Sequence, residues 1–383
     1  MRKNEKIKIL GAGPTGSLAA LALAGLGFDV VIYDTKTSSE IQKRSRAYAL
    51  TYSSRKLLID IGIWENALLL MSPFKSVYIK DLYINKSFTF NSEDLPIFYR
   101  DNPVGWIVEH EKLMQFLHNN LSLSSRIITR FHTETDLSLK DFKYLIAADG
   151  PNSSTRDLLG ISNFTYNYRE ACLTFKALIR GASANTAYEF FTPEGPLALL
   201  PINRDLYQIV WSSQYSICKK RELLSTSAFL DRLASVLPKY IQPDVLINKP
   251  MTFGSKISLS WKYYRNRILL IGESSHKYHP VGGQGLNICW RDVDELRTYF
   301  KKYLDSGLDD KNLLRSYTKS RTLDLYSMGV VTHLLISIFS NRNIMLLPFK
   351  NIIFYLLNKS LFLRRTVLRI MTFGPSYLNK KIN

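Results

Sequence analysis

The chain has 383 residues and carries 51 Lys and Arg side chains against 32 Asp and Glu, a formal net charge of +19. Its hydrophobic share of 46%, with 20 Phe, 22 Tyr and 5 Trp, excludes a disordered or low-complexity chain. The 3 cysteines are widely spaced, which excludes a disulfide framework or a zinc ribbon and favours a reducing, intracellular location. At roughly 100–200 residues per domain, the length predicts two or three domains.

The N-terminus and the hydropathy pattern exclude further classes. No apolar leader with a cleavage site follows Met1, so we expect no signal peptide. No window reaches the roughly 18 uncharged apolar residues of a spanning helix, so we expect no transmembrane segment. The positive surplus predicts an anionic partner, which could be nucleic acid, a phosphorylated ligand or a membrane surface.

The chain opens with a strand–turn–helix–strand pattern. An apolar run at 7–10 ends at Gly11, a helix of small residues covers 14–26, and a second buried strand at 28–33 ends at Asp34. The turn reads Gly11-Ala-Gly13-Pro14-Thr15-Gly16. Its glycines permit a tight turn, approach of a pyrophosphate and close helix packing, while the helix N-terminus favours an anion. Asp34 follows where it would accept a ribose hydroxyl, so we expect a bound dinucleotide rather than an incidental glycine turn.

The remaining elements alternate between α/β and β-rich stretches. After a basic stretch at 36–55, helical periodicity covers 56–70 and alternating residues over 74–100 predict antiparallel strands with one wet face. A helix is expected at 109–121, a buried strand at 144–148, a β-rich region at 170–262, a third buried strand at 267–271 and a helix at 285–300. Residues 310–383 read as helical.

We therefore predict an α/β fold with a Rossmann-type nucleotide domain in three stretches, an inserted β-rich substrate domain and a helical C-terminal region. The nucleotide domain would comprise residues 1–73, 105–165 and 264–325. The β-rich substrate domain would comprise 74–104 and 166–263, and the basic helical region 326–383.

Two later motifs narrow the identity of the expected dinucleotide. The second buried strand leads to Asp149-Gly150-Pro-Asn-Ser-Ser-Thr-Arg156, and the third to Gly272-Glu273-Ser-Ser-His276-Lys-Tyr-His279-Pro280-Val-Gly-Gly283-Gln284-Gly285-Leu286-Asn287. Both resemble signatures of the FAD-dependent aromatic hydroxylases, the group A flavoprotein monooxygenases. The stretches at 46–50, 105–109 and 191–201 resemble the ubiquinone-biosynthesis (UbiH-like) branch, and the likeness covers about residues 5–325.

The resemblance implies an FAD site and its residues. The expected cofactor-binding residues are Gly11, Gly13, Pro14, Thr15, Gly16, Asp34, Arg46, Asp149, Gly150, Gly272, Glu273, Pro280, Gly283, Gln284, Gly285, Leu286 and Asn287. Pro280 would stand over the flavin ring, and His279 is a possible substrate-side group. The family has Asp where this chain has Glu273, one methylene longer, so the contact with the ribityl chain would shift.

Several positions keep a second interpretation. Asp149 and Arg156 would belong to the flavin turn or form a surface ion pair, and Arg46 with Arg55 would lie near the flavin or on a solvated face. His276 and His279 have no acidic or thiol ligand nearby, so we expect no metal site. Cys289 is most simply a packing residue.

The resemblance implies hydroxylation of a polyprenylated phenol, a quinone precursor, in which FAD reduced by NAD(P)H reacts with O2 to give a C4a-hydroperoxyflavin. One alternative keeps the flavin but acts on a soluble phenol or reduces a prenyl lipid. Another is an inactive scaffold of a membrane biosynthetic complex, with other quinone-biosynthesis enzymes as partners.

The end of the chain combines charge with apolar residues. Residues 341–383 contain 8 basic side chains and no acidic one, among many Leu, Ile and Phe. This pattern predicts a segment that lies on an anionic membrane surface, and thus a cytoplasmic, peripherally membrane-associated protein. A helical cap with a basic outer face, or a dimer contact, is the alternative. We expect no nucleic-acid binding, because no binding module accompanies the charge.

Overall fold

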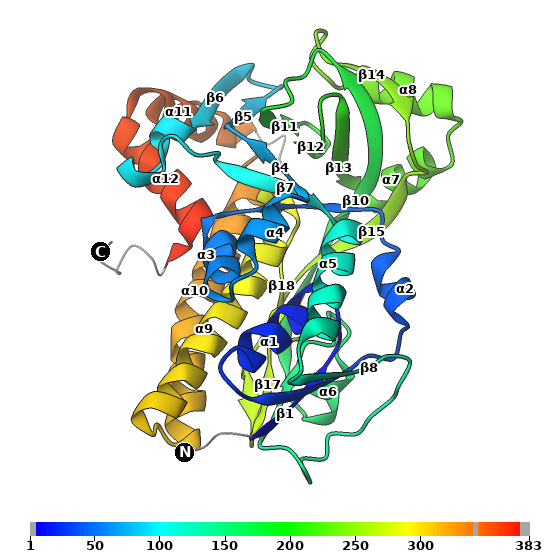
Figure 1. The fold of residues 1–383 in the computed structure, drawn as a ribbon. Coiled ribbons are helices and arrows are strands. Elements are labelled where there is room, and N and C mark those ends of the chain that lie inside the picture. Colours follow the sequence, from blue (N-terminus) through cyan, green and yellow to red (C-terminus); the bar gives the residue numbers. More distant parts are fainter. Residues whose placement is uncertain (1–4, 340–343, 376–383) are drawn as a thin grey trace.

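The computed structural model describes residues 5–339 and 344–375. The part of the molecule drawn at the bottom of Figure 1 contains a six-stranded sheet in the order β16–β17–β9–β1–β2–β8. All neighbours are parallel except β16 and β17. The strands are β1 (Lys6–Leu10), β2 (Asp29–Tyr33), β8 (Ile127–Arg130), β9 (Tyr144–Ala147), β16 (Tyr264–Arg265) and β17 (Ile268–Leu270). The three buried strands predicted near residues 7, 144 and 267 therefore lie side by side.

Helices pack against this sheet through small and aliphatic residues. Helix α1 contacts β1, β2, α5 and α9, and its Leu18, Ala19 and Leu23 have no exposed surface. Its small residues let the neighbouring helices approach closely, which places the α1 N-terminus beside the β1 turn. The helices are α1 (Pro14–Ala24), α3 (Tyr52–Asp60), α4 (Trp64–Leu68), α5 (His110–Leu123), α6 (Ser154–Leu158), α9 (Gly285–Ser306) and α10 (Asp310–Phe339).

A second sheet of nine strands lies at the top of Figure 1, in the order β18–β15–β10–β13–β12–β11–β5–β6 with β14 paired to β10. Its strands are β5 (Ser76–Asp81), β6 (Lys86–Asn91), β10 (Asn163–Arg180), β11 (Thr186–Thr192), β12 (Gly195–Pro201), β13 (Leu206–Gln214), β14 (Gln242–Leu246), β15 (Met251–Ser260) and β18 (His276–Lys277). The β5–β6 pair is antiparallel as predicted, but β5 joins the sheet by a parallel pairing with β11. Phe175 and Trp211 pack with Phe229 of α8 (Thr226–Ala234), and α7 (Tyr215–Glu222) contacts β10, β13 and β15.

A small sheet of β3 (Ala47–Leu50), β7 (Gly105–Glu109) and β4 (Met71–Phe74) completes the described strands. Strand β3 and the short helix α2 (Ser38–Gln42) fall inside the stretch at 36–55, for which the sequence predicted no regular element. Short 3-10 turns lie at Ser92–Asp94, Ile97–Tyr99, Gly272–Ser274, Val281–Gly283 and Ile344–Leu346. The predicted domain boundaries remain a prediction, whereas the pairings show that two distant chain segments share the large sheet.

Helix α10 has the length and hydropathy of a membrane span when up to two charged residues are allowed, whereas the prediction concerned uncharged windows. Within the described ranges, it is one helix of 30 residues that passes this test by length and composition. Its Tyr317, Arg321 and Leu325 are nevertheless buried, and Arg321 forms an ion pair with Asp292 of α9. These contacts belong to a helix packed on the protein.

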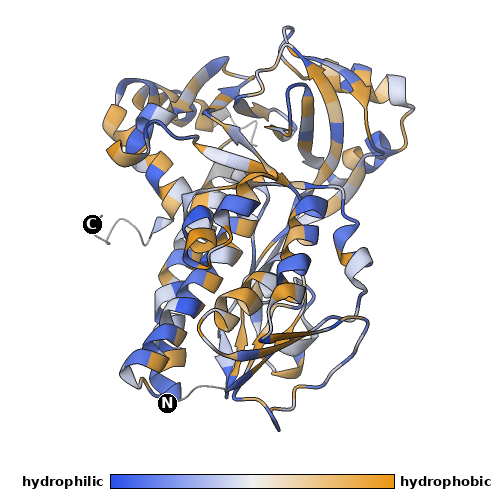
Figure 2. Ribbon diagram, viewed as in Figure 1, coloured by the Kyte–Doolittle hydropathy of each residue, from blue (hydrophilic) through white to orange (hydrophobic). Residues whose placement is uncertain are grey.

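The predicted basic segment forms two helices in the described part of the chain, α11 (Leu347–Lys359) and α12 (Leu361–Phe373), and two of its basic residues are paired inside the protein. Lys350 is buried and lies 3.2 Å from Asp81 of β5, and Arg364 donates to Asp94 at 2.9 Å. These two charges are therefore neutralised inside the protein. Large side chains are also exposed on these helices, including Phe349, Ile352, Tyr355 and Phe362. Figure 2 shows hydrophobic residues along both helices. Arg342, Lys380 and Lys381 lie outside the described residues.

Candidate functional site

A cavity of about 1170 Å³ extends between the two large sheets and the C-terminal helices. At one end it is lined by the turn after β1, and at the other by one face of the nine-stranded sheet and by α10, α11 and α12. Single small-molecule pockets typically enclose about 300–1,000 Å³. The cavity therefore has room for a dinucleotide and a second ligand.

The turn after β1 has the conformation that the glycine motif predicts. Gly11 has φ +95°, and a Cβ added there would lie 2.4 Å from the carbonyl oxygen of Ala148. Gly13, Pro14 and Thr15 line the cavity. Gly16 does not line it: an added Cβ would lie 1.8 Å from the Gly11 carbonyl oxygen, so Gly16 closes the turn onto the helix.

The N-terminus of α1 is available to an anion. No side chain caps its N–H groups, Pro14 occupies the first turn, and no acidic residue lies there. Because unpaired N–H groups and the helix dipole attract negative charge, this end of the cavity suits a pyrophosphate.

Asp34 at the end of β2 lines the cavity and holds the same turn. Its carboxylate accepts hydrogen bonds from the backbone N–H of Ala12 at 2.7 Å and of Lys36 at 2.9 Å. A carboxylate offers about four lone-pair sites, so two remain for the hydroxyls of a ribose. The structure thus brings Asp34 and the glycine turn together as predicted.

The turn after β9 supplies a second polar wall. Asp149 and Gly150 line the cavity, and Gly150 has φ +86°. One oxygen of Asp149 accepts from the N–H of Thr155 at 3.1 Å, while the other is buried without a partner in the described protein. An orphaned buried carboxylate oxygen is costly and fits a site where a ligand donates a hydrogen bond. Arg156 is buried and donates to the Ser274 carbonyl at 3.2 Å, so it does more than form an ion pair at the surface.

The loop before α9 forms the third wall. The lining residues that the motif predicted here are Glu273, Pro280, Gly283, Gln284, Gly285 and Leu286. Gly282 and Gly283 have φ +71° and +63°, a backbone that L side chains rarely adopt, so flat backbone faces the cavity. Helix α9 begins at Gly285 with no side-chain cap and no acidic residue in its first turn.

Two predicted cofactor residues support this loop from behind instead of lining the cavity. The Gly272 N–H donates to Asp292 at 2.7 Å. The Asn287 side chain accepts from the Thr51 N–H at 3.0 Å and donates to the Ala49 carbonyl at 2.8 Å, which ties the start of α9 to β3. Gly272 and Asn287 therefore contribute to the site indirectly, because their hydrogen bonds hold the backbone of the loop in place.

The structure corrects the expected position of His279. This side chain is buried outside the cavity lining, where its Nδ1 accepts from the N–H of Val281 and its ring packs edge-on against Tyr168. Burial lowers the pKa of His279 to about 4, so its ring is neutral near pH 7. The chain direction at the neighbouring Pro280, which does line the cavity, turns His279 away.

A buried charge network beneath the loop was not predicted. His276 lies 2.7 Å from one oxygen of Asp292, and Arg321 donates to the other at 2.7 Å. Arg321 and Arg291 both donate to Asp324 of α10. Although burial raises the pKa of Asp292, the charges of His276 and Arg321 lower it to about 2. Because no sequence pattern links α9 to α10, only the helix packing reveals this network.

A second missed pair joins β3 to the start of α5. The Tyr48 hydroxyl lies 2.8 Å from Nδ1 of His110, whose Nε2 donates to the Ile41 carbonyl at 2.7 Å. Burial lowers the pKa of His110 to about 4. The ring is therefore neutral, with its proton on Nε2, and Tyr48 donates to Nδ1. Both side chains line the cavity.

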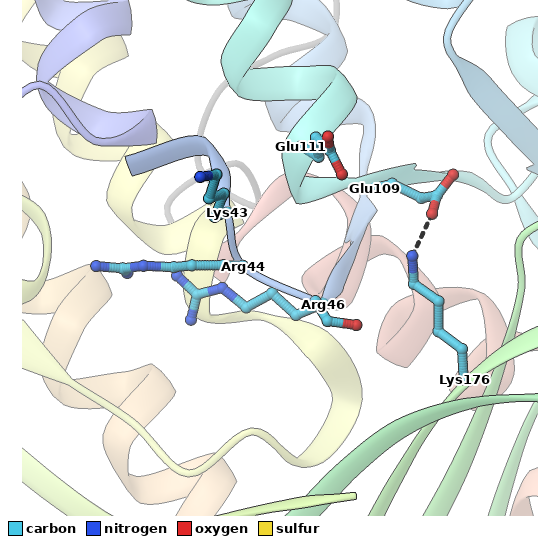
Figure 3. A pocket seen from close by; sticks show the side chains of 7 residues that line it. Lys43, Arg44, Arg46, Glu109, Glu111 and Lys176 are labelled. Atoms are coloured by element: carbon cyan, nitrogen blue, oxygen red, sulfur yellow. Dashed lines mark hydrogen bonds and ion pairs between the residues drawn. The ribbon is translucent and has the colours of Figure 1, made fainter. Parts of the chain in front are cut away.

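A smaller pocket of about 290 Å³ opens beside the large cavity (Figure 3). Lys43, Arg44 and Arg46 line both spaces. In Figure 3 the two arginine side chains extend away from the ion pair between Glu109 and Lys176. The Arg46 Nε is buried without a partner, so Arg46 lies in the site and not on a solvated face.

A family model described as an FAD binding domain matches residues 108–326, more than half of the chain. The chain belongs to this FAD-binding family. Buried polar atoms without partners, left-handed glycines and two uncapped helix N-termini agree with a cofactor of that kind in the cavity.

Relatives of this flavoprotein support the same class. The 3-demethoxyubiquinol 3-hydroxylase of Escherichia coli is 24% identical, over 76% of this chain and 78% of the relative. The human ubiquinone biosynthesis monooxygenase COQ6 is 24% identical, over 79% of this chain and 78% of the relative. The uncharacterized Synechocystis protein slr1300 is 28% identical, over 88% and 85% of the two chains.

Solved structures share the fold. The p-nitrophenol 4-monooxygenase PnpA of Pseudomonas putida superposes with a TM-score of 0.76 at 16% identity, covering 98% of this chain and 100% of PnpA. Klebsiella pneumoniae HpxO, complexed with FAD and uric acid, gives 0.74 at 18% identity, over 97% and 96% of the chains. The predicted fold class, the resemblance to FAD-dependent hydroxylases and the cofactor FAD are thus confirmed.

Proposed function

We propose that this flavoprotein hydroxylates the aromatic ring of a polyprenylated phenol in quinone biosynthesis, with O2 as co-substrate and NAD(P)H as reductant. The names of the E. coli and human relatives support the pathway class. The observation that carries the proposal is the shape of the cavity, which joins the predicted FAD residues to an apolar compartment.

The apolar compartment would hold the ring and the first part of the prenyl tail. Its lining from the C-terminal helices is almost entirely aliphatic or aromatic, and includes Leu334, Ile338, Phe339, Ile353, Leu357, Val367, Leu368 and Met371. Burial of prenyl carbons here would stabilise the complex by about 25 cal/mol for each Å² of apolar surface removed from water. A small soluble phenol would leave most of this surface uncovered, which disfavours that alternative.

In this proposal the described residues bind and orient FAD. Backbone N–H groups of Gly13 and Thr15 would hold the pyrophosphate, Asp34 the ribose and Glu273 the ribityl chain. Pro280 and the glycine loop at 282–285 would face the flavin ring. The bound and reduced FAD would supply the activation of O2, and the enclosed apolar wall would exclude water from the reacting oxygen.

The apolar outer face of α11 and α12 would rest on a membrane surface, which is where a prenylated substrate dissolves. Ile353 and Leu357 line the cavity while the adjacent Ile352 and Leu356 are exposed, so one helix would contact both the lipid and the substrate site. Lys350 and Arg364 are paired inside the protein, so the charge contribution to this contact would come from the other basic residues of the segment, such as the exposed Lys359.

The lipid-quinone profile of a deletion strain tests this proposal. We expect an under-hydroxylated prenylated phenol to accumulate, and its structure identifies the missing hydroxyl. Complementation with Gly13→Asp, which places a carboxylate at the pyrophosphate position, should fail although the protein is made. Restored quinone synthesis by a flavin-free variant would instead favour the scaffold hypothesis. Reduction of a prenyl double bond without ring hydroxylation would favour the reductase.

A further inference from the structure

One wall of the apolar compartment carries a single row of side chains across six strands. The register places Ile79 opposite Glu189, Glu189 opposite Ala198, and Ala198 opposite Val210. Val210 in turn lies opposite Thr174, and Thr174 opposite Met251. All six residues line the cavity, and Glu189 of β11 is the one charged member of the row.

The Glu189 carboxyl is not engaged by the protein. Within residues 5–339 and 344–375, no hydrogen bond or ion pair reaches it, and burial alone raises its pKa to about 8. Thr174 in the same row accepts from Gln208 Nε2 at 2.8 Å. Glu189 is partly buried, and its carboxyl faces a largely apolar cavity without a protein partner, so it is available to a polar group of a ligand.

Among the described residues, no ion pair reaches Glu189 from the neighbouring elements. Phe191, two residues along the same strand, stacks on Phe339 of α10 at 4.5 Å. On this sheet Asp81 pairs with Lys350 of α11 and Lys176 with Glu109, while Lys277 of the edge strand β18 also lines the cavity. His279 and Glu170 lie outside the cavity lining, and the neutral His110 already accepts a hydrogen bond from the Tyr48 hydroxyl. Glu189 is therefore the acid–base group of the apolar wall.

We infer that Glu189 accepts the phenolic proton of the ring substrate. The inference rests on the proposed function, and it assigns the general base of that site. The phenol O–H bond breaks, its electron pair stays on the oxygen and the proton forms a new O–H bond on the Glu189 carboxylate. No oxidant or reductant takes part in this step. The phenolate oxygen then raises the electron density of the ortho and para ring carbons, which hydroxylation requires.

The acid–base match supports this role. General bases work best when their pKa lies near the working pH, and positioned bases accelerate proton transfer about 10²–10⁴-fold. An ordinary glutamate, with a pKa near 4.3, would be a weak acceptor for a phenol with a pKa of about 10. Burial on the sheet wall makes Glu189 a stronger base, and above neutral pH a substantial fraction of the molecules still carries the ionised carboxylate that can accept a proton.

The experiment uses purified holoenzyme with 2-geranylphenol as a short-tailed probe, and compares wild type with Glu189→Gln and with Glu170→Gln. Glu170 is a matched control, because burial raises its pKa as well but it does not line the cavity. We expect Glu189→Gln to keep its flavin spectrum and its rate of reduction by NADPH. Its kcat should fall about 100-fold or more at pH 8, and Glu170→Gln should match wild type.

Two further readouts separate a base from a structural residue. The wild-type kcat/KM should rise through pH 8 and then level, whereas Glu189→Gln should rise steadily toward the pKa of the phenol. A ring-fluorinated, more acidic geranylphenol should recover much of the lost rate in Glu189→Gln. Two results would overturn the inference: a Glu189→Gln variant whose kcat/KM still rises through pH 8 and then levels, or one that loses the same fraction of its rate with both phenols. If wild type itself converts neither phenol, the proposed function fails first.

Discussion

Replacing Asp292 by Asn should strongly destabilise the protein and release FAD. Asp292 is fully buried and accepts from the Gly272 N–H, from His276 and from Arg321, each at 2.7 Å. Asn keeps the size of the side chain but removes the charge. Arg321 and Arg291 would then share Asp324 as their one remaining carboxylate.

The expected magnitude follows from the buried ion pairs. Removing one partner of a buried pair typically costs about 3–5 kcal/mol, because the other charge is left uncompensated. The lowered pKa of Asp292, about 2 against an ordinary 3.8, corresponds to a preference for the ionised form of about 2.5 kcal/mol. We therefore expect a loss of about 3 kcal/mol or more in the free energy of unfolding.

Urea unfolding followed by intrinsic fluorescence, with flavin absorbance of the purified protein, measures both effects. Asp294→Asn is the matched control on the same helix, since Asp294 pairs with the half-exposed Lys56 and should lose less than about 1 kcal/mol. Adding Arg321→Met to Asp292→Asn should recover part of the loss, because it removes the unpaired cation. A loss below about 1 kcal/mol in Asp292→Asn would refute the assigned role of the network.

Three further outcomes are expected. Gly16→Val should yield protein without flavin absorbance, since a Cβ at residue 16 would lie 1.8 Å from the Gly11 carbonyl oxygen. At Gly13 an added Cβ meets no heavy atom within 4 Å, so Gly13→Ala should fold, with its affinity for flavin reduced several-fold. Titration with FAD compares the two variants. Because the folded pKa of Asp292 lies below its unfolded value, its stabilising contribution is complete above pH 4 and should disappear between about pH 4 and pH 2, seen as a falling urea midpoint. Phe349→Ser combined with Phe362→Ser should reduce co-sedimentation with phosphatidylglycerol vesicles several-fold at unchanged melting temperature, measured at high salt where the attraction between charges is screened. Equal binding of wild type and the double variant at high salt would contradict an apolar contact.

Local patterns carried most of what the sequence could predict. The turn from Gly11 to Gly16, the strand ending at Asp34 and the loop containing Pro280 each combine a buried strand with glycines a few residues away, so their chemistry is readable along the chain. The position of His279 was wrong because a single turn decides whether a loop side chain faces the cavity. Strand β3 was missed because its four residues sit in a strongly basic stretch.

Non-local pairing explains the remaining differences. The partners of Lys350 and Arg364 are Asp81 and Asp94, about 270 residues earlier, so the basic C-terminus looked unpaired when it was considered alone. Glu189 likewise has its neighbours on strands β5 and β12, and β5 joins β11 through a parallel pairing between distant segments. Only this register shows that the carboxyl stands in an apolar row.

The two uses of charge in this protein follow from the same cost of burial. At Asp292 the carboxylate meets Arg321, His276 and a backbone N–H, and the pKa falls because the ionised form is satisfied inside the protein. At Glu189 nothing in the described protein meets the carboxyl, and the pKa rises because the cost of burial is not compensated. A compensated charge stabilises the loop that would hold FAD, whereas an uncompensated one is available to a substrate. This contrast, more than the net charge of +19, distinguishes the structural acid from the reactive one.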